Sequence, residues 1–281
     1  MTKVRDNDGN TWRPSKSLGQ NFLVDKFYIN EILERSDCRK EDHVLEIGAG
    51  LGYLTFPLAR RVLRVTALEK DPFLFRKLEE KKTYLSDLEN VELILADALK
   101  FSYTTLVAPV KVIGNLPYSV ATAILLHLIT VRNNLTSIYI TIQREVAEKI
   151  LAKPGQKDYG SLSIYVQYYF EGAILFTIPA QAFKPKPKIE SSFVRLTPHQ
   201  SPPVHLNDEE LFFRLIRKAF SQRRKTLWNN LKTADFLSFA EGTWESVFRR
   251  LNLDQRVRAQ DLSLESFALL CNTTKVCLQN S

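Results

Sequence analysis

Four consecutive residues, Asn115-Leu116-Pro117-Tyr118, carry side chains that could hold a planar base with an exocyclic amine. The Asn side-chain carbonyl can accept a hydrogen bond from the amine, the Pro fixes the backbone, and the Tyr ring can stack on the base. An apolar run at 110–113 precedes the motif and a helical pattern at 121–129 follows it. We therefore expect a strand to deliver these residues to its carboxyl end, where open α/β sheets bind ligands.

A glycine-rich segment lies upstream of this motif. Residues 44–52 read Val-Leu-Glu-Ile-Gly-Ala-Gly-Leu-Gly, so an apolar strand runs into three alternating glycines and then into a helical pattern. Glycine lets a backbone approach a ligand closely, and the first turn of a helix offers free N–H groups. Because the spacing is G-x-G-x-G rather than the G-x-G-x-x-G of dinucleotide folds, a pyrophosphate is not the expected ligand.

Two acidic residues follow two further predicted strands. Glu69 ends the apolar run 65–68, and a carboxylate there can accept both hydroxyls of a ribose. Asp97 ends the run 91–96, where it could accept a hydrogen bond from an adenine amine. Glycine-rich turns are often only turns, and acids at strand ends are often only solvated. Four such features in order, each at a strand end, nevertheless indicate an adenosine without phosphates, and S-adenosylmethionine fits this description.

These motifs require a sheet that brings strand ends together, and the sequence predicts one. Strand and helix patterns alternate, which is typical of a mostly parallel sheet with helices on both faces. The predicted elements are a helix at 26–36 capped by Asp25, a strand at 43–47, a helix at 53–61, a strand at 64–68, a helix at 72–82, strands at 91–95 and 110–114, a helix at 120–130, a strand at 136–142 and a helix at 144–151. Aromatic and β-branched segments near 161–170 and 173–178 and a final strand at 192–196 complete this part.

The composition changes at residues 197–203, Thr-Pro-His-Gln-Ser-Pro-Pro, which we interpret as a linker. Only helical patterns follow, so we expect one domain over 1–200 and a small all-helical domain over 205–281. Asn207 and Glu210 resemble a capping box at its start. The predicted core of its first helix is the stripe of Phe212, Leu215, Ile216, Ala219 and Phe220, with further apolar runs at 236–239, 247–251 and 264–270. Arg214, Arg217, Ser221 and Arg224 lie on a different face of that helix, which could face RNA.

Positive charge is concentrated in one part of the chain. The net charge is +8, and residues 181–230 hold ten Lys and Arg against four Asp and Glu. We call the basic residues of this segment the basic band, which includes Lys184, Lys186, Lys188, Arg214, Arg217, Lys218, Arg223, Arg224 and Lys225. Prolines at 185 and 187 keep the first three lysines on extended chain rather than on a solvated helix face. Such a band points to a polyanion, most simply a nucleic acid.

Composition argues against several other classes of protein. The 281 residues are 44% hydrophobic and 25% charged, which is ordinary for a globular protein. No apolar stretch approaches the roughly 20 residues that span a bilayer, and the first residues lack the apolar core of a signal peptide. The three cysteines, Cys38, Cys271 and Cys277, form no C-x-x-C pair, and the four histidines show no ligand spacing. We expect a cytoplasmic protein with reduced thiols and without a metal site.

Together these motifs resemble those of the ribosomal RNA adenine dimethyltransferases, the KsgA-type family of class I methyltransferases, over nearly the whole chain. The matching segments are Lys16–Leu23 (K-x-L-G-Q-N-F-L), the glycine loop Leu45–Thr55, Asn115–Tyr118 (N-L-P-Y), Tyr159–Ser163 (Y-G-x-L-S), Phe183–Ser191 (F-x-P-x-P-x-V-x-S) and Phe220–Leu231, which contains Arg223-Arg224-Lys225. Ala49 stands where Pro is frequent and Ile189 where Val is usual. Neither position carries chemistry.

The resemblance implies an α/β fold, with a Rossmann-like class I methyltransferase domain that uses S-adenosylmethionine and a small helical RNA-binding domain. It implies an enzyme that dimethylates N6 of two adjacent adenosines in a hairpin loop near the 3′ end of small-subunit (16S) rRNA, acting as a monomer on the assembling small ribosomal subunit. It assigns cofactor contacts to Asn21, Leu23, Gly48, Glu69, Asp97 and Asn115, and catalytic roles to Asn115, Leu116, Pro117, Tyr118 and Phe183. Phe183 would be a second aromatic for a flipped base, and Lys184, Lys186, Lys188, Arg223, Arg224 and Lys225 would contact RNA.

Four alternatives remain open. Resistance methyltransferases of large-subunit RNA share the Q-N-F and N-[LI]-P-Y elements, but the Pro-Lys-Pro loop and Arg223-Arg224-Lys225 favour a small-subunit enzyme. DNA adenine methyltransferases usually carry an Asp/Asn-Pro-Pro-aromatic motif, and a small-molecule methyltransferase would not need the basic band. A non-catalytic ribosome-assembly factor or mitochondrial transcription factor could use the same scaffold, although intact Glu69, Asn115 and Tyr118 favour catalysis.

Overall fold

The computed structural model describes residues 4–5, 11–12, 19–85, 87–106, 109–236 and 242–279. The motif residues 16–18 and the apolar residues 237–239 therefore lie outside the described part. The chain divides into two compact units, which we call the sheet unit (Met1–Ala147 and Glu171–Pro198) and the helical unit (Glu148–Phe170 and His199–Ser281). The boundary predicted near residues 200–205 lies close to the point where the helical unit resumes, and residues 148–170 also belong to that unit.

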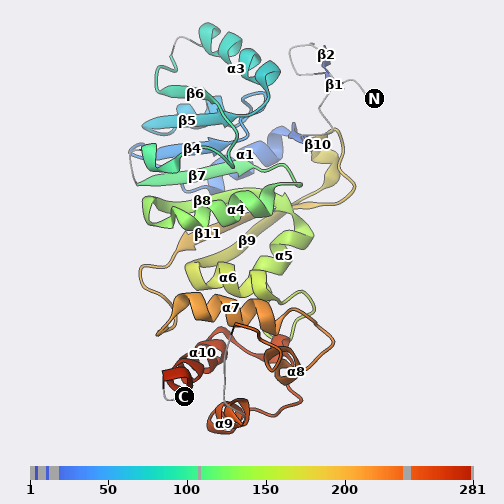
Figure 1. Cartoon of the computed structure of the whole chain (residues 1–281). Coiled ribbons are helices and arrows are strands. Elements are labelled where there is room, and N and C mark those ends of the chain that lie inside the picture. Colours follow the sequence, from blue (N-terminus) through green and yellow to red (C-terminus); the bar gives the residue numbers. More distant parts are fainter. Residues whose placement is uncertain are drawn as a thin grey trace. The chain divides into compact units, whose positions relative to one another are not determined.

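Seven strands form the sheet of the sheet unit (Figure 1). They are β4 (His43–Ile47), β5 (Arg64–Glu69), β6 (Val91–Leu95), β7 (Val110–Asn115), β8 (Leu135–Gln143), β9 (Phe170–Ile178) and β11 (Ser191–Pro198), in the spatial order β6-β5-β4-β7-β8-β11-β9. The strands from β6 to β8 are parallel, and β11 runs antiparallel to β8. The chain order reverses between β4 and β7, and such a switch point places a ligand crevice beyond the carboxyl ends of the strands.

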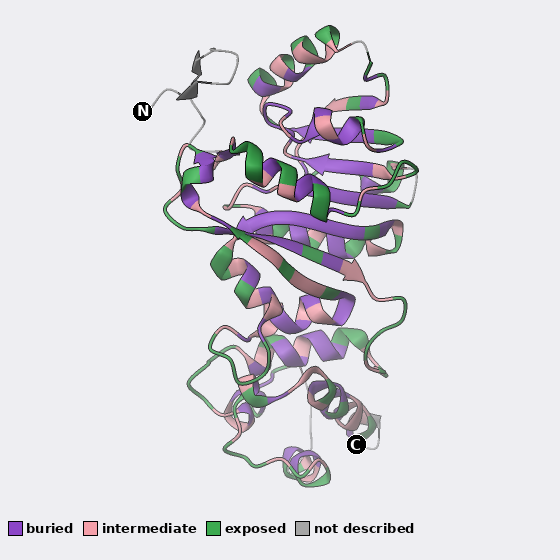
Figure 2. Ribbon diagram, turned by 180° about the vertical axis from the view of Figure 1, so that it is seen from behind, coloured by how far each residue is buried: buried purple, intermediate pink, exposed green. Residues whose placement is uncertain are grey.

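Helices cover both faces of this sheet, as the alternating patterns predicted. They are α1 (Lys26–Arg35), α2 (Thr55–Ala59), α3 (Pro72–Tyr84), α4 (Ala121–Thr130) and α5 (Arg144–Leu151). In Figure 1 α4 lies in front of the sheet and α1 behind it. The predicted cap of α1 is confirmed, because the Asp25 side chain accepts a hydrogen bond from the Phe27 N–H. Ile32 of α1 and Leu58 of α2 share one core cluster with the strands, and Figure 2 shows the central strands buried.

Two short ribbons complete the sheet unit. Strands β1 (Val4–Arg5) and β2 (Thr11–Trp12) pair with each other, and β3 (Phe22–Leu23) pairs antiparallel with β10 (Phe183–Lys184). The Val24 N–H also donates to the Ala182 carbonyl at 3.0 Å. The β3–β10 ribbon therefore joins the segment before α1 to the proline-rich segment that carries the first lysines of the basic band.

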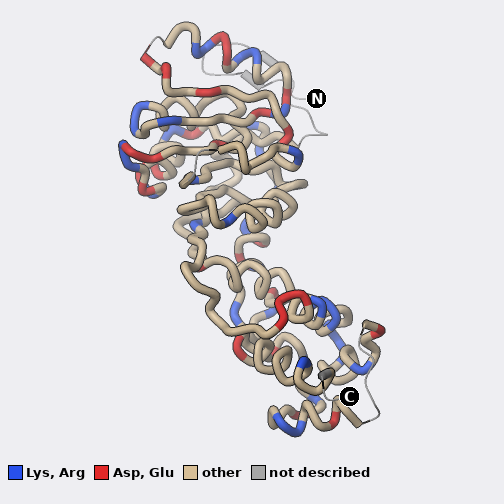
Figure 3. The backbone as a smooth tube through the Cα atoms, turned by 60° about the vertical axis from the view of Figure 1, so that its left-hand side comes forward, with Lys and Arg blue, Asp and Glu red and all other residues tan. Residues whose placement is uncertain are grey.

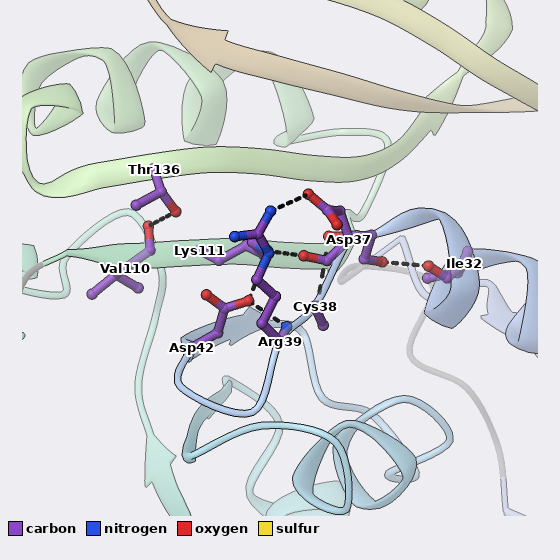
Figure 4. Close-up of polar contacts among 9 residues, drawn as sticks. Ile32, Asp37, Cys38, Arg39, Asp42, Val110, Lys111 and Thr136 are labelled. Atoms are coloured by element: carbon purple, nitrogen blue, oxygen red, sulfur yellow. Dashed lines mark hydrogen bonds and ion pairs between the residues drawn. The ribbon is translucent and has the colours of Figure 1, made fainter.

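A buried lysine fixes the amino end of β7 (Figure 4). The Lys111 side chain is 8% exposed, and its Nζ donates to the Asp37 carbonyl and forms an ion pair of 2.8 Å with Asp42 Oδ2. The Arg39 N–H donates to the same Asp42 oxygen at 2.7 Å. Removing one partner of a buried pair leaves an uncompensated charge, so this cluster ties the loop between α1 and β4 to the central strand.

The helical unit contains α6 (Ser161–Tyr169), α7 (Glu209–Ala219), α8 (Leu227–Leu231), α9 (Thr243–Arg250) and α10 (Leu264–Gln279). Four of the five residues of the predicted apolar stripe of α7 are confirmed as core, because Phe212, Leu215, Ile216 and Ala219 are all buried. The fifth, Phe220, is only half-buried and caps the carboxyl end of α7. Tyr168 and Tyr169 donate hydrogen bonds to the two carboxylate oxygens of Glu209. None of the described helices is long and apolar enough to cross a membrane.

Two local predictions for this unit were wrong or incomplete. Asp208, not Asn207, caps α7, because Asp208 Oδ1 accepts a hydrogen bond from the Leu211 N–H at 2.8 Å. The Asn207 N–H instead donates to Asn272 Oδ1, a contact from a distant helix that no local pattern could reveal. Residues 161–169 form α6, although their aromatic and β-branched composition did not predict a helix. At the start of α6, the Ser163 hydroxyl accepts a hydrogen bond from the Gly160 N–H.

Candidate active site

A cavity of about 140 Å³ lies at the carboxyl ends of β4, β5, β6 and β7. Five of the six residues assigned to a cofactor line it: Asn21, Gly48, Glu69, Asp97 and Asn115. Its other walls are Gly19, Gln20, Phe22, Ile47, Gly50, Leu68, Lys70, Leu74, Ala96, Ala98, Pro117, Ser119, Val120 and Ile124. The features that the sequence placed at separate strand ends therefore surround one space, at the switch point of the sheet.

The glycine loop forms the floor of this cavity. Gly48 and Gly50 have φ angles of +81° and +59°, a region that residues with a Cβ rarely adopt. A Cβ on Gly50 would come within 3.2 Å of the Phe22 ring, and one on Gly52 within 2.3 Å of the Phe56 ring. Glycine is thus required here both for the turn and for close packing, and the loop leaves its backbone open to a ligand.

Glu69 is the carboxylate at the end of β5, and only 7% of its surface is exposed. One oxygen accepts a hydrogen bond from the Gly50 N–H at 2.8 Å and the other from the Asp71 N–H at 2.7 Å. Burial raises the pKa of Glu69, while these backbone donors lower it part of the way back. Each carboxylate oxygen can accept more than one hydrogen bond, so both remain able to accept from a pair of hydroxyls.

Asp97 follows β6, the strand that pairs with β5, and also lines the cavity. Its Oδ1 accepts from the Leu99 N–H at 3.0 Å, and its Oδ2 forms an ion pair of 2.8 Å with the Lys70 side chain. The hydrogen bond from Lys70 is the main reason why the pKa of Asp97 lies below its ordinary value. Asp97 is therefore a fixed anion, suited to accept a hydrogen bond from an amine.

The Asn115 side chain is oriented by a single backbone group. Its Nδ2 donates to the Asn21 carbonyl at 2.9 Å, so the amide nitrogen is committed to the segment before α1. The Oδ1 atom carries the remaining capacity of the amide, which is to accept. Because Asn115 is both the last residue of β7 and part of the cavity wall, this oxygen is available to an amine at the cavity.

The segment 19–24 holds several of these groups together. Gln20 Nε2 donates to Asp71 Oδ2 at 2.9 Å, and the Phe22 ring packs against Gly50. Leu23 was also assigned to the cofactor, but its side chain is 4% exposed in the main core cluster and does not line the cavity. The segment 19–24 therefore packs against the glycine loop, and the side chain of Leu23 holds it to the core.

The rest of the Asn-Leu-Pro-Tyr motif follows the end of β7, and neither Leu116 nor Tyr118 is among the residues that line the cavity. Leu116 is buried, and its N–H donates to the Thr141 carbonyl at 3.1 Å, which fixes the turn after β7. Pro117 lines the cavity. Tyr118 is half-buried, and its hydroxyl lies 2.5 Å from Ser191 Oγ. Burial raises the pKa of Tyr118, so its hydroxyl stays protonated at neutral pH.

In the proline-rich segment 183–188, the aromatic side chain is buried and the lysine side chains are exposed. Phe183, which the resemblance assigned to a flipped base, is 1% exposed and packs in the same cluster as Leu23. For Phe183 to stack on a base, its ring has to leave that cluster. Lys184, Lys186 and Lys188 are all exposed, and none forms an ion pair with another described residue.

In the helical unit, Figure 3 shows basic stretches along the chain. Arg224 and Lys225 are exposed. Arg223 is committed to the unit itself, because its guanidinium donates to the Lys157 and Tyr159 carbonyls. On α7, the Arg214 guanidinium lies 4.4 Å from the centre of the Phe236 ring. Arg214, Arg217, Lys218, Ser221 and Phe236 line a shallow basic depression.

Sequence reasoning missed two charged groups, one that lines the cavity and one buried within β4. Lys70 lines it and pairs with Asp97; its position directly after Glu69 was the available signal. Glu46, the last but one residue of β4, is 2% exposed, and its Oε2 has no hydrogen-bond partner among the described residues. Burial raises the pKa of Glu46 to about 7, the Thr55 hydroxyl lowers it, and the charge of Glu69 raises it further. An acid inside an otherwise apolar strand pattern was the signal here.

Comparisons with known proteins agree with this geometry. The family described as ribosomal RNA adenine dimethylase matches residues 12–275. The chain is 41% identical over 271 residues to ribosomal RNA small subunit methyltransferase A of Moorella thermoacetica, with 92% of each chain covered. It is 40% identical over 266 residues to the protein of the same name from Geobacillus kaustophilus, with 92% of this chain and 89% of the relative covered.

Two solved structures share the fold. A dimethyladenosine transferase from Plasmodium falciparum superposes with a TM-score of 0.77 at 23% identity, covering 89% of this chain and 95% of that one. The 23S rRNA methyltransferase ErmE superposes with a TM-score of 0.69 at 25% identity, covering 90% and 99%. The expected class I methyltransferase fold is confirmed. Because the family match spans most of the sequence and agrees with the arrangement of the cavity, this chain belongs to the ribosomal RNA adenine dimethylase family.

Proposed function

We propose that this chain transfers methyl groups from S-adenosylmethionine to N6 of two adjacent adenosines in a hairpin loop near the 3′ end of small-subunit (16S) rRNA, within the assembling small ribosomal subunit. As a member of its family, the chain is an S-adenosylmethionine-dependent rRNA adenine dimethyltransferase. The observation that carries the proposal is the fixed Asn115 amide, whose nitrogen binds the Asn21 carbonyl and whose oxygen can accept at the cavity. We also propose that the protein acts as a monomer in the cytoplasm, where its three free cysteines stay reduced.

The residues around the cavity fit the groups of S-adenosylmethionine. Glu69 offers two acceptor oxygens to ribose hydroxyls, and Asp97 offers one to the adenine amine. Leu68, Ala98 and Ile124 supply apolar surface for the adenine ring. The glycine loop lets the protein backbone come close to the ligand. When bound, the cofactor supplies the electrophilic sulfonium methyl group.

The task of Asn115 follows from the chemistry of the adenine amine. This nitrogen is a poor nucleophile, because its lone pair is delocalised into the ring. By accepting hydrogen bonds from it, Asn115 Oδ1 and the Leu116 carbonyl favour a pyramidal nitrogen with a localised lone pair. Attack then requires mainly proximity and alignment. The nitrogen becomes acidic once it carries a new methyl group, so no strong base is required, and the motif contains no His or Lys.

The target base has to leave its stack to reach this site, and unstacking costs a few kcal/mol. Stacking on the Tyr118 ring offsets part of that cost. We propose that Phe183 provides a second face, after its ring turns out of the core cluster in which it lies here. Exposed Lys184, Lys186 and Lys188 stand next to Phe183 in the chain, where they can neutralise phosphates beside the extruded nucleotide.

Methylation of large-subunit rRNA is the second candidate, because the 23S rRNA methyltransferase ErmE shares this fold. Two observations favour the small subunit. The relatives at 41% and 40% identity are named small-subunit methyltransferases. In addition, the Lys-Pro-Lys-Pro-Lys segment and the Arg223-Arg224-Lys225 element match the small-subunit enzymes.

Purified protein, methyl-labelled S-adenosylmethionine and unmodified ribosomal subunits test the proposal. The wild type should label small-subunit RNA and yield dimethyladenosine on digestion, while Asn115→Ala should yield none. Asn133→Ala is the matched control, since Asn133 is exposed and lies outside the cavity. Label that appears only in large-subunit RNA would support the second candidate, and transfer by Asn115→Ala at the wild-type rate would contradict the role of the amide.

A further inference from the structure

The Tyr118 hydroxyl has a buried partner that no part of the reaction described so far uses. Tyr118 Oη and Ser191 Oγ lie 2.5 Å apart, a short and well-formed hydrogen bond. Ser191 has no exposed surface, whereas Tyr118 is half-buried. The bond therefore reaches from the stacking ring into the interior of the sheet unit.

Backbone contacts with the end of β8 hold Ser191 in place. Ser191 is the first residue of β11 and lies opposite Gln143 at the end of β8. Immediately before it, the Glu190 carbonyl accepts from the Arg144 N–H at 3.1 Å, and the two side chains form an ion pair of 2.9 Å. The Ser191 backbone is thus fixed at the place where the lysine-bearing segment 184–190 rejoins the sheet, and its buried hydroxyl bonds with Tyr118.

The Tyr118 ring, in contrast, belongs to a turn. The Leu116 N–H donates to the Thr141 carbonyl and the Val120 N–H to the Pro117 carbonyl, so the backbone on either side of Tyr118 is fixed. The ring itself can still rotate about its side-chain bonds unless something holds its far end. A free ring loses this rotational freedom when a base stacks on it, and that loss opposes binding.

We propose that Ser191 is a positioning residue for the target base: its buried hydroxyl holds the Tyr118 ring in the stacking orientation and links that ring to the lysine-bearing segment. This inference rests on the proposed stacking of the target adenine on Tyr118. It assigns to Ser191 an effect on methyl transfer that acts only through Tyr118 and leaves cofactor binding unchanged.

A double-mutant cycle tests this proposal, with kcat/KM for methyl transfer to small-subunit RNA as the readout. Ser191→Ala and Tyr118→Phe should each lower kcat/KM by about five-fold, the value of one ordinary hydrogen bond. The double variant should be no slower than either single variant, because both remove the same interaction. Ser192→Ala is the matched control: Ser192 is equally buried, but its Oγ has no hydrogen-bond partner among the described residues.

Three results would overturn the inference. The first is a Ser191→Ala variant as active as Ser192→Ala. The second is a double variant slowed by about 25-fold, the product of two independent effects. The third is weaker S-adenosylmethionine binding by Ser191→Ala in calorimetry, which would indicate a general structural defect. A wild type that transfers no methyl group to small-subunit RNA would instead refute the proposed function, so the two failures are distinguishable.

Discussion

Backbone hydrogen bonds orient the side chains of Glu69, Asp97 and Asn115 even without a ligand. Glu69 accepts from two N–H groups, Asp97 from one, and Asn115 donates to one carbonyl. These bonds fix the side chains while leaving acceptor capacity at the cavity. The residue types and their order predicted this set of acceptors. The partners that orient them, such as the Asn21 carbonyl, are far away in the sequence and were not predictable.

Cofactor binding should depend on the Glu69 carboxylate. Glu69→Ala removes the proposed acceptors for two ribose hydroxyls, which should cost about 1–3 kcal/mol of binding free energy, or roughly 5- to 150-fold in Kd. Calorimetry with S-adenosylmethionine measures this directly. Glu89→Ala, which removes an exposed acid outside the cavity, should bind like the wild type. Equal affinity of a folded Glu69→Ala variant would place the cofactor elsewhere.

Glu46 should make folding stability depend on pH. Burial raises the pKa of Glu46 to about 7 from an ordinary value of 4.5, so the folded chain holds this proton more tightly than the unfolded chain. The stabilisation is complete below pH 4.5 and is lost as the pH rises through about 7, for a total of about 3 kcal/mol. Urea unfolding of the wild type and Glu46→Gln between pH 5 and pH 8 measures it. The variant should lose less stability over this range, and parallel curves would contradict the prediction.

At the scale of elements, the sequence predicted the sheet well and the loops less well. Strands β4 and β6 begin and end at the predicted residues, because each is a short apolar run that is closely followed by a turn-forming or acidic residue, Gly48 after β4 and Asp97 after β6. Helix α2 is shorter than predicted, since Gly52 and the residues after it belong to the glycine turn. The burial of Leu23 and Phe183 comes from the β3–β10 ribbon, which pairs segments about 160 residues apart and leaves no local signal.

The glycine loop predicts a matched pair of variants. Gly48 and Gly155 have nearly equal φ angles, +81° and +82°, so alanine at either position should lose a similar 1–2 kcal/mol of stability, on the order of the usual left-handed penalty. A methyl group added at Gly155 would meet no atom within 4 Å and would lie outside the cavity, whereas Gly48 lines the cavity. Only Gly48→Ala should weaken S-adenosylmethionine binding, by about ten-fold or more. Calorimetry showing equal affinity for both variants would argue against a cofactor on this loop.

At the scale of the whole molecule, the basic band is divided between the two units. Lys184, Lys186 and Lys188 belong to the sheet unit, while Arg223, Arg224 and Lys225 belong to the helical unit. The sequence predicted the charge of these residues but not which of them bond within the protein and which are exposed to solvent. Arg223 is committed to the loop at 157–159, and Arg224 and Lys225 are exposed. A polyanion as large as ribosomal RNA can contact basic groups on both units.

This difference predicts how salt affects RNA binding. Replacing Arg224 and Lys225 together by Ala should make the plot of log affinity against log salt shallower by about 1–2, because each lost phosphate contact contributes roughly 0.7–0.9 to the slope. Arg223→Ala should mainly lower the unfolding temperature, since it frees two loop carbonyls. Filter binding over a range of salt concentrations, with thermal unfolding alongside, separates the two effects. An unchanged slope in the double variant would show that these residues do not touch phosphates.

Mass spectrometry of small-subunit rRNA from cells that lack this protein tests most directly whether the chain dimethylates that RNA. We predict that dimethyladenosine is absent from a hairpin loop near the 3′ end of that RNA, at two adjacent positions. The wild-type chain should restore both modifications, and the Asn115→Ala variant, expressed to the same level, should restore neither. Dimethyladenosine that persists in cells without the protein, or that Asn115→Ala restores fully, would contradict the proposed activity and the role of Asn115.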